Sequence, residues 1–108
     1  MRRGDVVTVT LAGDYGKPRP GLVVQSDAAA ELPSVVVCPF TSDLQAEQPS
    51  LRILVDPAPT NGLRRASQVM VDKITAVPRG RIGGVIGRLD DQNMIRIDRA
   101  LALLLGIV

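Results

Sequence analysis

Two short segments of the chain carry the side chains with the clearest chemistry. The first, Lys17–Pro20 (KPRP), holds two cations that each precede a proline. Proline fixes its own φ and pushes the preceding residue towards extended conformations, so the Arg19 guanidinium is presented from a stiff turn. The second segment, Thr41–Asp43 (TSD), places two hydroxyls directly after an apolar run. A rigid arginine near a pair of hydroxyls is suited to bind and strain a phosphodiester, whereas a solvated basic turn is the competing interpretation.

The composition limits the kinds of chemistry that are open to this chain. Its 108 residues are enough for one domain with one core, and 45% of them are hydrophobic, which argues against disorder. The sequence has no histidine and one cysteine, Cys38. A structural zinc site and the common histidine-based acid–base machinery are therefore excluded in practice, as is an intrachain disulfide. We expect no metal and no cofactor.

The distribution of charge is more informative than its sum. The net charge is only +2, which is compatible with nucleic acid without indicating it. Five cations lie in one short stretch: Arg64, Arg65, Lys73, Arg79 and Arg81. The one acid in this stretch, Asp72, is a candidate charge partner for Lys73 or Arg79. Because Tyr15 and Phe40 are the only aromatic residues, base stacking is limited, and nucleic acid would have to be held through phosphates, backbone groups and arginines.

Hydrophobic periodicity predicts a mainly β chain. Residues 5–11 alternate apolar and polar side chains, which indicates a half-buried strand. Apolar runs predict further strands at 21–25, 34–39 and 51–55. Residues 66–72 and 73–77 are predicted to continue as two extended segments, with one kinked strand as the alternative. Residues 80–87 contain four glycines and predict a bent strand or a bulged barrel corner.

The C-terminal segment changes to a helical period. Met94, Ile97, Leu101 and Leu104 recur at steps of three and four, Asp90 or Asp91 is the expected N-cap, and Gly106 is the expected C-cap. The predicted fold is a small, strongly bent barrel of five to seven strands with this amphipathic helix laid over the sheet. No apolar run reaches about 18 residues and no signal-peptide core follows Met1, so we expect no membrane contact and a cytoplasmic location.

Five segments, in this order, resemble the MazF/PemK family of toxin endoribonucleases, the mRNA interferases of bacterial type II toxin–antitoxin pairs. They are Arg3–Val7 (RGDVV), Arg19–Val24 (RPGLVV), Thr41–Asp43 (TSD), Ser67–Ile74 (SQVMVDKI) and Ile82–Leu89 (IGGVIGRL) ahead of the helix. The resemblance covers nearly the whole chain, 1–108, as a single toxin domain. It implies an SH3-like barrel, a homodimer, and inhibition by a cognate antitoxin.

The activity that the resemblance implies is sequence-specific, metal-independent cleavage of single-stranded RNA, foremost mRNA, to a 2′,3′-cyclic phosphate and a 5′-hydroxyl. It implies a catalytic pair of Arg19, from a K-x-R-P motif, and Thr41, from a T-S motif, with Ser42 as a possible helper. Such a reaction needs neither a metal nor an enzyme nucleophile, because the 2′-hydroxyl attacks the adjacent phosphorus. The candidate RNA-binding residues are Lys17, Arg64, Arg65, Gln68, Lys73, Arg79 and Arg81.

Two other interpretations stay open from the sequence. A gyrase poison of the CcdB type shares this barrel and cuts nothing, but it depends on a C-terminal Trp-Gly-Ile, whereas this chain ends in Leu105–Val108 (LGIV) and has no tryptophan. A non-catalytic barrel that binds RNA or protein is the other alternative. It is kept open by the loop at residues 12–20, which is shorter than the loop often found there in the family.

Overall fold

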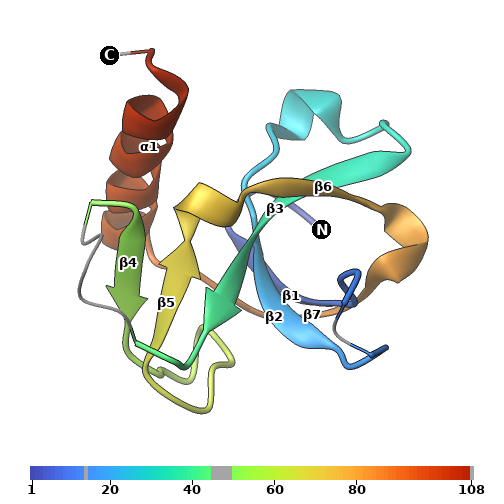
Figure 1. Cartoon of the computed structure of the whole chain (residues 1–108), viewed down its shortest axis with the longest axis horizontal. Helices are drawn as coiled ribbons and strands as arrows, with labels where there is room; N and C mark the ends of the chain where they lie inside the picture. Colours follow the sequence, from blue (N-terminus) through green and yellow to red (C-terminus); the bar gives the residue numbers. More distant parts are fainter. Residues whose placement is uncertain (14, 45–49, 108) are drawn as a thin grey trace.

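The computed structural model describes residues 1–13, 15–44 and 50–107 and shows a bent β-sheet flanked by a C-terminal helix (Figure 1). The strands are β1 (Asp5–Val9), β2 (Arg19–Val23), β3 (Ser34–Thr41), β4 (Arg52–Val55), β5 (Ser67–Met70), β6 (Thr75–Pro78) and β7 (Ile82–Arg88). Single 3₁₀ turns lie at η1 (Asp27–Ala29), η2 (Val71–Lys73) and η3 (Arg79–Arg81), and the helix is α1 (Asp91–Leu105). The mainly β class and the late helix are confirmed.

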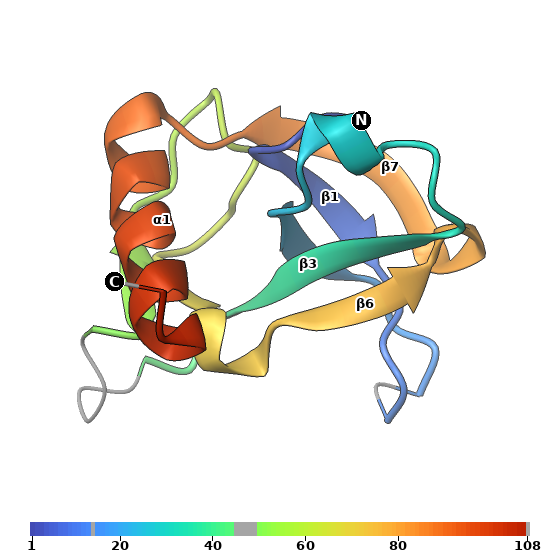
Figure 2. The same cartoon turned by 90° about the horizontal axis from the view of Figure 1, so that it is seen from above.

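The strands form an antiparallel path in the order β4-β5-β3-β2-β1-β7, with β6 paired to β3 off this path. The sheet curls strongly, as the two views at right angles show (Figures 1 and 2). Among the described residues no pairing joins the end strands β4 and β7, so the barrel is open rather than closed. The opening follows from β3, which bends out of one half of the sheet and into the other.

The segment 66–77 forms two strands, β5 and β6, in agreement with the two predicted extended segments, and the alternative of one kinked strand is wrong. The turn η2 separates the two strands, and Val71 in this turn is fully buried. The reason is that the two strands pair with different parts of β3: β5 aligns Val69 with Phe40, whereas β6 aligns Thr75 with Val37. The chain must therefore change direction between them.

The bulged strand and the capped helix follow their predictions. Strand β7 pairs with β1 through two register shifts, on either side of Val7. The side chain of Asp90 accepts a hydrogen bond from the Asn93 backbone N–H, and Gly106 ends α1 with a φ of 72°. The left-handed conformation at that position favours glycine, because other residues pay a steric cost there.

The apolar side chains form two clusters on opposite faces of the curled sheet. One cluster packs under α1 and includes Leu22, Cys38 and Ile97, and the other is a group of valines that includes Val9 and Val37. Burial raises the pKa of the Cys38 thiol to about 12, so this cysteine is an inert core residue, as its apolar neighbours in the sequence predict.

A buried asparagine organises the loop between β4 and β5. The Asn61 carboxamide oxygen accepts hydrogen bonds from the backbone N–H groups of Ala58 (3.1 Å) and Leu63 (3.0 Å), and its nitrogen donates to the Asp56 carbonyl (2.9 Å). Next to it, Gly62 has a φ of 72° and lies so close to β7 that a Cβ atom would stand 2.2 Å from the Ile86 carbonyl oxygen. This contact holds the loop that carries Arg64 and Arg65.

Replacing Gly62 with alanine should therefore destabilise the fold. The new methyl would meet the backbone of β7 and would also force a left-handed alanine, so we expect the free energy of unfolding to fall by about 2 kcal/mol or more. Gly80→Ala is the matched control, because a Cβ there meets nothing within 4 Å. It should change the stability by less than about 0.5 kcal/mol in the same urea titration. Equal stabilities of the two variants would contradict this account of the loop.

Candidate functional site

An open groove of about 840 Å³ lies where the loop after β1, the end of β3 and the segment 62–73 meet. Its floor is largely apolar and includes Phe40, Leu63 and Met70. Its polar lining includes Arg19, Thr41, Ser42, Asp43, Arg64, Arg65 and Lys73. The groove therefore gathers cations and hydroxyls from parts of the chain that are far apart in sequence.

The two residues proposed from the sequence as a catalytic pair both line this groove. Strand β2 pairs with β3 only from Gly21, opposite Pro39, to Val23, opposite Val37. Beyond this ladder Arg19 pairs with Val9 of β1 and Thr41 pairs with Gln68 of β5. Both residues nevertheless line the groove, Arg19 as an exposed side chain and Thr41 as a half-buried one.

The Thr41 hydroxyl is oriented by its own turn. Its Oγ1 accepts a hydrogen bond of 3.1 Å from the backbone N–H of Asp43. This bond uses a lone pair, so the hydroxyl proton can still be donated. Ser42 lies between the two and also lines the groove. The geometry provides one O–H donor and one guanidinium that face the same space.

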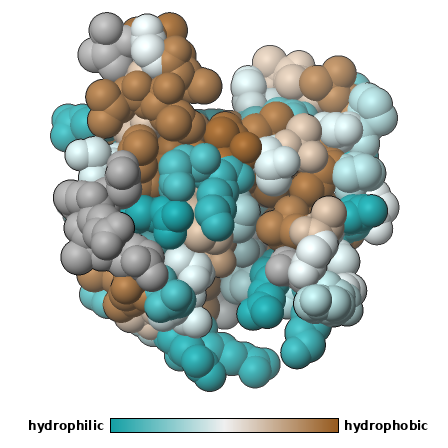
Figure 3. Space-filling view, in the orientation of Figure 1, coloured by the Kyte–Doolittle hydropathy of each residue, from teal (hydrophilic) through white to brown (hydrophobic). Residues whose placement is uncertain are grey.

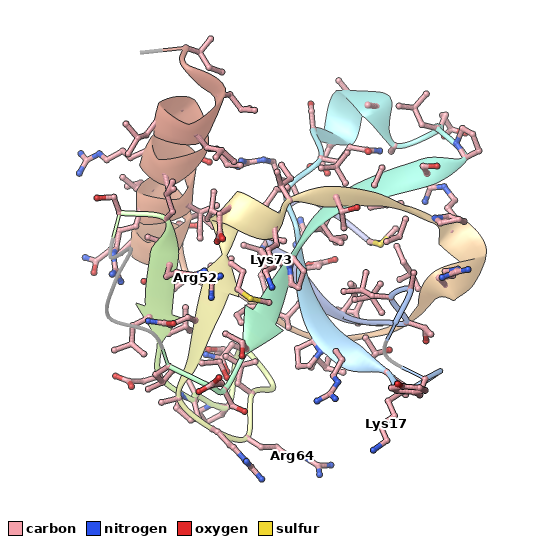
Figure 4. All side chains as sticks on the ribbon, in the orientation of Figure 1. Lys17, Arg52, Arg64 and Lys73 are labelled. Atoms are coloured by element: carbon pink, nitrogen blue, oxygen red, sulfur yellow. The ribbon has the colours of Figure 1, made fainter. Side chains whose placement is uncertain are left out.

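The cations of residues 64–81 divide into two groups in space. Arg64, Arg65 and Lys73 line the groove, whereas Arg79 and Arg81 do not. Lys17 precedes the lining residues Pro18 and Arg19, and its side chain points outward at the same end of the molecule as Arg64 (Figure 4).

Four of the predicted RNA-binding residues are not part of the groove lining: Lys17, Gln68, Arg79 and Arg81. Gln68 is buried in β5, with 8% of its surface exposed. Arg79 donates from Nε to the Leu32 carbonyl (2.7 Å) and from Nη2 to the Ala30 carbonyl, which ties η3 to the loop after η1. Arg81 lies in the same turn, and the described lining of the groove does not include it. Arg79 and Arg81 lie outside the lining because β6, which precedes their turn, pairs with the first half of β3 and leads the chain away from the groove.

One ion pair beside the groove was not foreseen. Arg52 of β4 binds Asp72 of η2 through two hydrogen bonds, Nε to Oδ1 at 2.6 Å and Nη2 to Oδ2 at 3.0 Å. Of the two candidate partners of Asp72, Arg79 is wrong, because it donates to backbone carbonyls, and Lys73 acts on Asp72 only as a weak neighbouring charge. The Arg52 hydrogen bonds lower the pKa of Asp72 below its ordinary 3.8, and the same bonds raise the pKa of Arg52. No sequence pattern predicts this ion pair, because it depends on how β4 and β5 align.

Comparison with known proteins identifies the family. A family model described as "PemK-like, MazF-like toxin of type II toxin-antitoxin system" matches residues 2–105. The chain belongs to this toxin family. It is 46% identical over 108 residues to the "Probable endoribonuclease MazF" of Mycolicibacterium smegmatis, covering 99% of this chain and 98% of the relative. It is 28% identical over 113 residues to "Endoribonuclease EndoA" of Bacillus subtilis, covering 100% and 97%.

Solved structures give the same fold for a MazF-like toxin. The structure titled "Endoribonuclease in complex with its cognate antitoxin from Mycobacterial species" superposes with a TM-score of 0.84 at 23% identity and covers 100% of this chain and 97% of that one. The resemblance inferred from the sequence is thus confirmed, and neither a gyrase poison nor a non-catalytic barrel is favoured. Over the described residues, no helix is long and apolar enough to cross a membrane.

The Arg52–Asp72 pair predicts a specific dependence of stability on pH. A carboxyl with a lowered pKa stabilises the fold above its ordinary pKa and loses that contribution as the pH falls through the lowered value. At pH 7, Asp72→Asn should lower the free energy of unfolding by about 1 kcal/mol, since the pair is partly screened by solvent. The difference from the wild type should shrink below about pH 4. Urea unfolding across this range measures it, and a difference independent of pH would refute it.

Proposed function

We propose that this chain is a sequence-specific, metal-independent endoribonuclease toxin that cleaves single-stranded RNA, foremost mRNA. The observation that carries the proposal is that Arg19 and Thr41, from two different strands, line one groove. The relative that is 46% identical over almost its full length is named an endoribonuclease, which supports the same activity. The groove is open, so an extended single strand can lie along it.

In the proposed reaction the RNA supplies the nucleophile. The 2′-oxygen attacks the adjacent phosphorus, the new O2′–P bond forms and the P–O5′ bond breaks, leaving a 2′,3′-cyclic phosphate and a 5′-hydroxyl. The 2′ proton passes to a base, and the leaving 5′-oxygen receives a proton. Arg19 stays protonated and can fork onto the two phosphoryl oxygens, whose charge grows in the transition state.

Thr41 assists by donating a hydrogen bond from its hydroxyl to a phosphoryl oxygen. The bond from the Asp43 N–H holds Oγ1 in place before substrate arrives, so little reorganisation is needed in the transition state. Ser42, on the same turn, is a secondary helper. The proton for the leaving 5′-oxygen comes from a water that the protonated Arg19 orients, and the proton lost from the 2′-hydroxyl restores the balance in solvent.

The catalytic roles predict a distinct set of cleavage results. Arg19→Ala and Thr41→Val should each lower kcat by about 10²–10³, because each removes a donor aimed at the developing charge. Thr41→Ser, which keeps the hydroxyl, should retain most activity. Cleavage of a defined RNA by the wild type should persist in EDTA and leave a cyclic phosphate, as mapped by end analysis.

The matched substrate control replaces the ribose at the cut site with deoxyribose, which removes the nucleophile and should abolish cleavage at that position. Undiminished cutting by Arg19→Ala, or cutting that stops in EDTA and returns with Mg²⁺, would refute the proposed mechanism.

Three cations of the groove lining, Arg64, Arg65 and Lys73, are proposed to hold the RNA backbone together with Lys17, which lies next to the lining. Each phosphate contact releases counterions, so the affinity falls with salt by a slope of about 0.7 per contact on a single strand. Replacing Arg64 and Arg65 together with glutamine should therefore reduce the slope by about 1.4. Arg81→Gln, from the group outside the groove, should leave it unchanged. Anisotropy titrations with an uncleavable deoxy-substituted strand measure the slope, and equal effects of both changes would contradict the division of the basic stretch.

The proposed partners are a cognate antitoxin and a second copy of this chain. The family description is of a toxin from a toxin–antitoxin system, and the similar mycobacterial endoribonuclease was solved with its antitoxin. An acidic flexible segment laid across the groove would exclude RNA.

A homodimer is supported by apolar side chains left exposed at the end of α1, namely Leu103, Leu105 and Ile107 (Figure 3). Sedimentation velocity tests the dimer, and a monomer at micromolar concentration would exclude it. A cytoplasmic location is part of the same proposal, because the mRNA substrate is there.

A further inference from the structure

We infer that Arg52 is a positioning residue for RNA binding: it neutralises Asp72 and so leaves the neighbouring Lys73 ammonium available to a backbone phosphate. The inference rests on the proposed function, and it gives a role to an arginine that touches no RNA. Lys73 lines the groove, whereas Arg52 and Asp72 are not among the described residues that do so. In the view of Figure 4 the labelled side chains of Arg52 and Lys73 lie next to each other by the end of β5.

The geometry commits Arg52 to the carboxylate. Both Asp72 oxygens accept from the same guanidinium, at 2.6 and 3.0 Å, and only 14% of the Arg52 side chain is exposed. The register of the strands explains the contact, since Arg52 of β4 aligns with Met70 of β5, two residues before Asp72. A half-buried fork that is fully matched to one carboxylate is poorly placed to bind a phosphate as well.

The charge of Asp72 would otherwise act on Lys73. The two residues are consecutive in η2, and the Lys73 charge contributes, as the smallest of several causes, to the lowered pKa of Asp72. Without Arg52, the carboxylate would be an unpaired anion at the edge of the groove. It would attract the Lys73 ammonium and repel the phosphates of an incoming strand.

The backbone of η2 is held independently of this ion pair. Val71 is fully buried, its N–H donates to the Leu51 carbonyl (3.0 Å), and the Ile74 N–H donates to the Val71 carbonyl (3.2 Å). Removing the Arg52 side chain should therefore leave η2 in place. The expected effect on RNA is electrostatic, and removing the carboxylate as well should reverse it.

A double-mutant cycle tests this, with binding of a labelled, deoxy-substituted single strand as the readout. At about 50 mM salt, Arg52→Gln should weaken binding roughly five- to tenfold and lower the salt slope by about 0.7, the effect of one lost phosphate contact. Adding Asp72→Asn to Arg52→Gln should restore both the affinity, to within about twofold, and the slope. In cleavage assays Arg52→Gln should raise KM and leave kcat unchanged.

The control for net charge is Arg99→Gln, which removes an exposed arginine of α1 outside the groove and should change binding by less than about twofold. If the double variant binds as weakly as Arg52→Gln, Arg52 acts on RNA directly or only through the fold, and the inference is overturned. If the wild type itself neither binds nor cleaves RNA, the proposed function fails and this role fails with it. If the wild type cleaves RNA but Asp72→Asn does not restore binding to the Arg52→Gln variant, the proposed function stands and only the role of Arg52 fails.

Discussion

The structure depends on the backbone pairing of one strand, β3. This strand hydrogen-bonds to β2 along its middle, to β6 along its first half and to β5 at its end, so three strands take their places from it. Its end, paired to β5, carries Thr41 into the groove lining, and its pairing with β2 begins two residues after Arg19, which lines the same groove. A shift of one residue would move every side chain of β3 to the other face and take Thr41 out of that lining.

The groove combines fixed polar groups with cations that reach outward. Thr41 is held by its turn, Arg19 by the prolines on either side, and Lys73 by a 3₁₀ turn anchored on buried Val71. Such preorganisation matters for a reaction in which the substrate provides the nucleophile, because the protein contributes mainly position and charge. Arg52 contributes in the same way without touching the substrate, because it neutralises Asp72 and so leaves the Lys73 charge available in the groove.

Much of the fold could be predicted from individual residues. The capped helix between Asp90 and Gly106 and the glycine-rich bulged strand follow from local rules of capping and φ. The first strand ends at Val9 and is buried on both faces rather than on one, because β2 and β7 both pair with it. The two extended segments in 66–77 could be predicted, but their separate pairing with the end and the first half of β3 could not. Gln68 shows the same limit, since whether a strand residue points inward is set by its partners.

The sequence by itself determined the residue types: a proline-braced arginine, a pair of hydroxyls after an apolar run, a chain without histidine, and an order of segments shared with one toxin family. Only the tertiary structure decided how the basic stretch is used. In the folded chain Arg64, Arg65 and Lys73 line the groove, whereas Arg79 donates hydrogen bonds to backbone carbonyls. Asp72 pairs with Arg52, which lies twenty residues away in the sequence. Local propensities act over a few residues, whereas charges meet across strands whose alignment depends on packing of the whole sheet.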